Sequence, residues 1–134
     1  MVILIIFVVV ASLIPRVSTT LAHSKVNRAA YVIAADFLLA QTDAARQRAP
    51  VIVQIMSDSL FLRITNASTG TVLRTDWFDV TSEFQLKALS AVPTSAQVMP
   101  NGTASASIVV TVGATTDYYH QVRMTLAGQV RIIK

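Results

Sequence analysis

The chain begins with an apolar run that a small globular domain cannot enclose. Residues 1–14 read MVILIIFVVVASLI, which carry no charge and a single polar side chain, that of Ser12. A helix that is hydrophobic on every side is satisfied by lipid or by other apolar helices, and not by water. We therefore expect a membrane helix, formed by Val2, Ile3, Leu4, Ile5, Ile6, Phe7, Val8, Val9, Val10, Leu13 and Ile14.

A proline separates this run from a second helical pattern. Pro15 lacks a backbone N–H and its ring presses on the preceding turn, so we expect a kink there. Arg16 can extend its charged end to the lipid interface. Residues 1–22 are thus predicted as a hydrophobic helix, and residues 24–48 as an amphipathic helix that Pro50 stops. The apolar stripe that should lie on the head comprises Val26, Ala30, Ile33, Phe37, Ala40 and Ala44.

Residues 51–134 change to the period-two pattern of strands. We expect strands at 51–56, 60–65, 71–78, 83–89, 105–112, 118–126 and 129–134. Residues 90–104 contain Pro93, Pro100 and Asn101-Gly102, which favour a long loop, and Ala127-Gly128 predicts a tight final turn. The predicted fold class is α+β, a long N-terminal helix packed on an antiparallel β-sheet head over residues 23–134.

Composition limits the kinds of site that this chain can hold. It has 134 residues, of which 53% are hydrophobic and only 13% are charged, against about 25% charged in an average domain. The absence of cysteine excludes disulfides, thiolate metal sites and cysteine nucleophiles. The net charge of +4 is modest, and it suits an anionic membrane surface, nucleic acid or an ordinary solvated face.

Candidate catalytic and metal-binding residues are few. His23 and His120 show no metal-ligand spacing, and we expect His120 to be a partly exposed strand residue. Asp76, Asp79 and Glu83 offer oxygen ligands for a cation but lack the spacing of a calcium loop, which favours solvated turn carboxylates. Neither a Gly-x-Ser-x-Gly motif nor a phosphate-binding glycine loop is present in the sequence. We therefore expect that the protein is not an enzyme and that it binds neither a cofactor nor a metal ion.

Three stretches resemble the minor pseudopilins and minor pilins of the GspH/FimT group, which belong to type II secretion systems and type IV pili. The first is MVILIIFVVVASLIP, leading into a long helix. The second is RAAYVIAADFLLAQTDAARQRAPVIVQI, a small-residue helix ending in an Ala-rich, Arg-containing turn before Pro-Val and the first strand. The third is VRMTLAGQVRII, a closing hairpin around a glycine. The resemblance covers both ends of the chain well and the middle loosely.

This resemblance implies a function as well as a fold. It implies a structural minor subunit of a pseudopilus or pilus, with other pilin or pseudopilin subunits as partners. In that family the hydrophobic helix is first anchored in the bacterial inner membrane as a single pass, with the head in the periplasm. It later packs into the core of a filament, and secretion cargo is a further implied partner.

The start of the sequence departs from the family pattern. Such proteins carry a glycine cleavage site, a phenylalanine that becomes methylated and an acidic residue before the apolar run, and none of these precedes Met1. Because the run is also shorter than the about 20 residues that span a bilayer, we expect an internal start rather than a lost processing site. A secretory signal cleaved after Thr20-Leu21-Ala22 is an alternative.

Two other functions compete with the structural one. Some pilin-like relatives bind DNA through a Gly-Arg-x-Arg turn, which here is Gly128-Gln-Val-Arg131. Arg123, Arg131 and Lys134 could still contact phosphates along one edge of the sheet, although the strand register is needed to bring them together. The other alternative is a secreted β-rich binding module released by signal cleavage.

Overall fold

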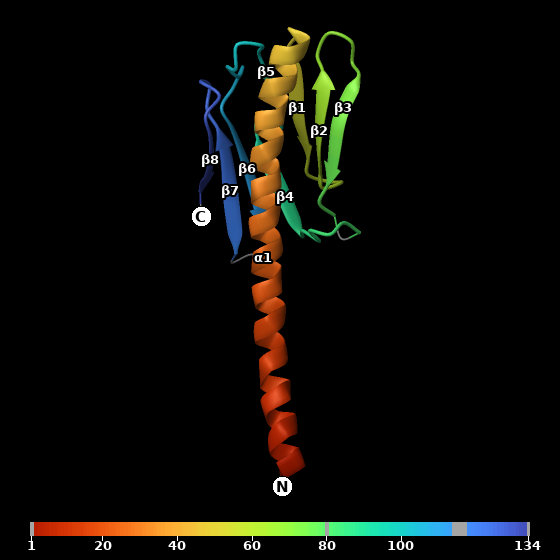
Figure 1. The fold of residues 1–134 in the computed structure, drawn as a ribbon, viewed down its shortest axis with the longest axis vertical. Coiled ribbons are helices and arrows are strands. Elements are labelled where there is room, and N and C mark those ends of the chain that lie inside the picture. Colours follow the sequence, from red (N-terminus) through yellow and green to blue (C-terminus); the bar gives the residue numbers. More distant parts are fainter. Residues whose placement is uncertain (1, 80, 114–117, 134) are drawn as a thin grey trace.

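One helix organises the whole molecule. The computed structural model describes residues 2–79, 81–113 and 118–133, without the side chains of 12–19, and helix α1 runs from Val2 to Gln47. Its C-terminal half lies against the strands and its N-terminal half projects beyond them (Figure 1). The helix is continuous through Pro15, so the hydrophobic and amphipathic segments belong to one helix. The kink at Pro15 stays a prediction.

The strands of the described chain form two antiparallel sheets of four strands each (Figure 1). Sheet A has the order β3-β2-β1-β5, and sheet B has the order β4-β6-β7-β8. The strand bounds are β1 Val51–Met56, β2 Phe61–Asn66, β3 Val72–Trp77, β4 Ala88–Val92, β5 Ser95–Val98, β6 Ile108–Gly113, β7 Tyr119–Met124 and β8 Val130–Ile133.

The middle of the chain differs from the sequence prediction. The strand expected at 83–89 begins only at Ala88, and residues 90–104, expected as a loop, contain the rest of β4 and all of β5. At Pro93, which follows a cis peptide bond, the chain leaves sheet B, where β4 pairs with β6, and enters sheet A, where β5 pairs with β1. Because Pro93 lies between the two ladders, its missing N–H removes no strand hydrogen bond. The proline therefore marks a change of sheet rather than a loop.

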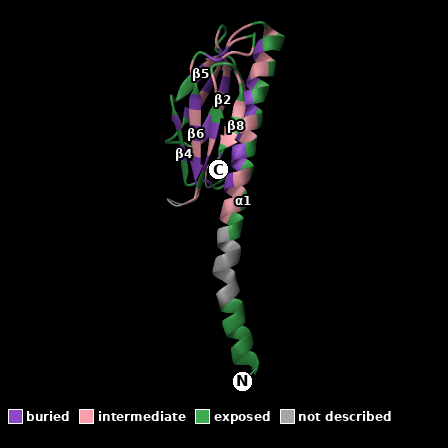
Figure 2. Cartoon of the chain, turned by 90° about the vertical axis from the view of Figure 1, so that its left-hand side faces the viewer, coloured by how far each residue is buried: buried purple, intermediate pink, exposed green. Residues whose placement is uncertain are grey.

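The core lies between α1 and the inner faces of both sheets. All six residues of the predicted apolar stripe are at most 1% exposed. Figure 2 shows that the buried part of α1, in purple, is the part that lies beside the strands. The α+β arrangement of a long helix packed on antiparallel sheet is thereby confirmed. The largest fully buried strand side chains are Ile55, Leu62, Ile64, Ile108 and Met124.

The final hairpin is tied to α1 at its turn. Gly128 has a φ of +85°, in the left-handed region that favours glycine. A Cβ atom built at this position would lie 2.0 Å from the carbonyl oxygen of Gly102. The Gln41 Nε2 of α1 donates a hydrogen bond to the Gly128 carbonyl at 2.6 Å. The predicted Ala127-Gly128 turn is therefore confirmed, and its glycine is required by both conformation and space.

Candidate functional site

The projecting end of α1 presents apolar side chains to solvent all the way round. The side chains of Val2–Val10 are 51–82% exposed. Figure 2 shows this end of α1 in green, beyond the strands of the head. A continuous apolar surface of this kind marks a site of contact with a membrane or another protein. Leu13, Ile14 and Pro15 lie in the stretch whose side chains are not described. Within the described residues, no helix is long and apolar enough to cross a membrane.

Apolar side chains also lie on the outer face of α1 within the head. Tyr31 is 59% exposed and Leu38 is 53% exposed, and their spacing of seven residues places them on one face, opposite the buried stripe. The neighbouring Leu39 is 40% exposed. This exposed apolar face was not predicted from the sequence, because the buried stripe dominates the pattern of apolar residues along the helix. The feature that indicates it is the seven-residue spacing of Tyr31 and Leu38, two large apolar side chains that lie off the buried stripe.

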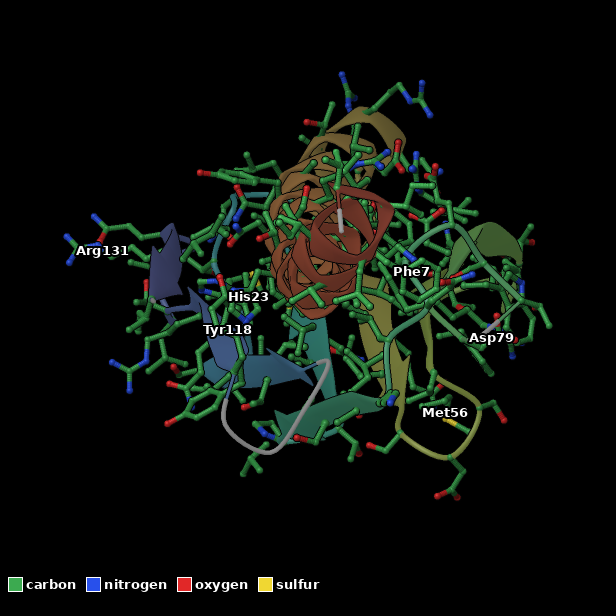
Figure 3. All side chains as sticks on the ribbon, turned by 90° about the horizontal axis from the view of Figure 1, so that it is seen from below. Phe7, His23, Met56, Asp79, Tyr118 and Arg131 are labelled. Carbon is green, nitrogen blue, oxygen red and sulfur yellow. The ribbon has the colours of Figure 1, made fainter. Side chains whose placement is uncertain are left out.

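The two arginines considered for phosphate contact meet on the outer face of sheet B. Arg123 of β7 and Arg131 of β8 are direct partners in the strand register, and both are exposed. Figure 3 shows Arg131 pointing away from α1. The described strands of sheet B contain no Asp or Glu. Like charges directly opposite each other are unfavourable in a sheet, so this pair is suited to sharing an anion. Lys134 lies outside the described residues.

Solved structures of two proteins share this architecture. The type IV minor pilin FimU of Pseudomonas aeruginosa matches in two crystal forms, with TM-scores of 0.63 and 0.66 and 18% identity. These matches cover 81% and 83% of this chain and 92% and 90% of FimU. The minor pseudopilin EpsH from the type 2 secretion system of Vibrio cholerae matches with a TM-score of 0.62 and 18% identity, over 81% of this chain and 96% of EpsH. The chain has the fold of a minor pilin. No family model and no curated protein matches the sequence, so the likeness is one of structure.

The two histidines of the head belong to one aromatic cluster. The expectation that His120 is partly exposed was wrong, because its position on β7 turns it inward and leaves it 4% exposed. Its Nε2 lies 2.9 Å from the hydroxyl of Tyr118. His23 of α1 stacks on the same Tyr118 ring, with 3.6 Å between the ring centroids (Figure 3). The cluster joins the base of the head to the helix, and the described residues contain no group of three or more potential metal ligands.

The three carboxylates that could have formed a cation site have separate partners. Asp76 lies in β3 rather than in a turn, and it accepts a hydrogen bond from Arg74. Asp79 accepts hydrogen bonds from the backbone of the turn that follows it. Glu83 forms an exposed ion pair with Arg28 of α1, at 3.4 Å. The three carboxylates therefore contact three different groups.

A carboxyl group that the sequence analysis did not single out is buried between α1 and β3. The side chain of Asp36 is 1% exposed, and its Oδ1 lies 3.0 Å from Nε of Arg74. The same Nε lies 2.7 Å from Oδ2 of Asp76. Burial and the nearby Asp76 carboxylate both disfavour the charged form and raise the pKa of Asp36 to about 8. Its sequence signal is an acidic residue beside Phe37 of the buried stripe.

Proposed function

We propose that this protein is a structural, non-catalytic minor subunit of a type II secretion pseudopilus or a type IV pilus. Its minor-pilin fold supports the class, since the matched structures are a minor pilin and a minor pseudopilin. The observation that carries the proposal is the exposed apolar end of α1, Val2–Val10, projecting from a head that has its own core. Lipid satisfies such a rod before assembly, and the helices of neighbouring subunits satisfy it in a filament.

The proposal places the protein in the bacterial inner membrane, with its head in the periplasm, and in the filament after assembly. Its partners are then other pilin or pseudopilin subunits. Deleting the gene should block assembly of the pilus or secretion through the pseudopilus. The full chain should restore assembly, whereas a shortened chain that begins at Ser24 should not. Restoration by the shortened chain would contradict a role for the apolar helix.

Anchoring by the helix can be tested without knowing which filament is served. We expect the full chain to sediment with membranes and to resist extraction by high salt or alkali, because neither treatment competes with apolar burial. The chain that begins at Ser24 should be soluble, monomeric and folded. A full chain that remains in the aqueous fraction would rule out the anchor.

DNA binding is a second candidate, favoured by the facing Arg123 and Arg131 on a sheet whose described strands lack carboxylates. With Gln129 where DNA-binding relatives have arginine, we expect at most about three phosphate contacts and affinity no tighter than about 10⁻⁴ M at physiological salt. A salt titration of the head with duplex DNA measures this, with Arg131→Ala as the comparison. Sub-micromolar binding that collapses in the variant would make DNA uptake the better function.

A secreted β-rich module is distinguished from a filament subunit by its mature N-terminus. Sequencing the N-terminus of the protein isolated from cells separates the two. A start after Ala22 supports a released module, and a methylated phenylalanine ahead of Met1 supports a pilin subunit.

A further inference from the structure

The contact between α1 and the edge strand β3 joins the buried carboxyl group of Asp36 to the partly exposed side chains of Arg74 and Asp76. In the strand register, Arg74 pairs with Ile64 and Asp76 pairs with Leu62, both of which are fully buried. Arg74 and Asp76 therefore lie on the inner face of sheet A, toward α1. There the Arg74 Nε lies between Asp76 and Asp36, the buried acid of the helix.

The hydrogen bonding of this trio is incomplete if both acids are ionised. The Nε–H of Arg74 is donated to Asp76. Among the described residues, neither oxygen of Asp36 accepts a hydrogen bond. A buried carboxylate without a donor is costly, but a protonated carboxyl group becomes a donor itself. Oδ1 of Asp36 and Oδ2 of Asp76 lie 3.0 Å and 2.7 Å from the same Arg74 Nε, so the two carboxyl groups are neighbours. A proton on Asp36 can therefore be donated to the Asp76 carboxylate, which supplies the missing bond.

The other charges around the trio do not replace that proton. Asp43 lies two helical turns after Asp36 on the same side of α1. It also acts on Arg74, and it forms an ion pair with Arg46 at 3.0 Å. The inner faces of β1 and β2 contribute Val51, Val53, Ile55, Leu62 and Ile64, none of which is charged. Asp36 thus faces one cation, which it shares with two other carboxylates.

We propose that the carboxyl groups of Asp36 and Asp76 share one proton, and that this proton latches the edge strand β3 to α1. With the proton present, Asp36 donates to Asp76, and Arg74 balances the remaining negative charge. When the proton leaves, two carboxylates, of which that of Asp36 is buried, face one partly exposed guanidinium. Their repulsion then loosens β3, which has a strand neighbour on one side only.

The chain carries a built-in reporter for this latch. Trp77 is the only tryptophan, it ends β3, and it is 49% exposed beside its neighbour Phe61. For the full chain in a non-ionic detergent, we expect a single sigmoidal change in Trp77 fluorescence with a midpoint near pH 8. Carboxyl ¹³C NMR of the same sample should show the Asp36 resonance titrating over the same range.

Three variants separate the latch from other titrations. Asp36→Asn supplies an N–H donor that does not ionise, so the alkaline change should disappear while β3 stays in place. Asp76→Asn removes the proton acceptor and should lower the midpoint by about one pH unit or more. Glu83→Gln is the control, because this exposed carboxylate pairs with Arg28 and not with Arg74, and it should leave the midpoint unchanged. A flat titration of the native chain, an unchanged transition in Asp36→Asn, or an Asp36 resonance that titrates at an ordinary carboxyl pH would each overturn the proposal.

Discussion

Phe37 is the largest fully buried side chain that α1 contributes to the core. It belongs to the predicted apolar stripe, and a helix pattern of period 3.6 suffices to place it. Buried polar residues are harder to place from sequence than buried apolar ones. Asp36 and His120 carry polar groups that usually face water, yet helix rotation and strand alternation turn both inward. Each is accommodated by partners distant in sequence, Arg74 and Tyr118, which periodicity does not reveal.

Truncating Phe37 tests the assignment of the helix face. Phe37→Ala should cost about 3–5 kcal/mol of unfolding free energy, because it removes a large ring and leaves a cavity. Arg28→Ala, on the exposed side and in an ion pair with Glu83, should change it by less than about 0.5 kcal/mol. Urea unfolding of the chain that begins at Ser24 gives both values. Equal effects would mean that the helix face is wrong.

Asp36 should also make stability depend on pH. Its pKa is raised from 3.8 to about 8, so between these values the folded chain holds a proton that the unfolded chain has released. The free energy of unfolding should therefore fall as pH rises from about 4 to about 8, by at most about 1.4 kcal/mol per pH unit. The difference between native chain and Asp36→Asn, measured by urea unfolding from pH 5 to 9, isolates this contribution. Parallel curves would contradict it.

Elements of the fold follow from the sequence where pattern and turn residues agree. The long helix, β1, β2 and the closing hairpin are all predicted, because apolar spacing and a turn signal coincide at each. The stretch around β4 and β5 is not. Pro93 favours a loop there, but in the structure it separates β4, which pairs with β6 in sheet B, from β5, which pairs with β1 in sheet A. Local sequence does not tell a change of sheet from a loop.

The closing hairpin should depend on one glycine more than on another of the same conformation. Gly70 and Gly128 both have positive φ, +73° and +85°, but only Gly128 has atoms where a Cβ would lie. Gly70→Ala should cost about 1–2 kcal/mol from backbone strain alone. Gly128→Ala should cost clearly more, because the Gly102 carbonyl must also move. Thermal unfolding of the two variants compares them, and equal losses would show that the close approach is unimportant.

At the scale of the whole molecule, the chain joins a head that encloses its own apolar core to a helix end whose apolar side chains are left exposed. The head has a single core and could exist in water, whereas Val2–Val10 is exposed and apolar on all sides. The sequence predicted this division because an uncharged run of that length stands out in any pattern. That Arg123 and Arg131 lie directly opposite each other follows only from the register of β7 and β8, and the sequence alone does not determine this register. The exposed Tyr31 and Leu38 form a second apolar surface, on the outer face of the helix within the head.

The central claim is that this chain enters a filament through its apolar helix. The most direct measurement is co-sedimentation of the tagged chain with filaments sheared from cells, for the full chain, for Ile6→Asp and for the chain that begins at Ser24. We predict that the full chain sediments with the filaments. Ile6→Asp places a charge on the apolar rod and should reduce incorporation strongly, and the shortened chain should be absent from the filament fraction. Equal sedimentation of all three, or absence of the full chain from filaments, would contradict the account.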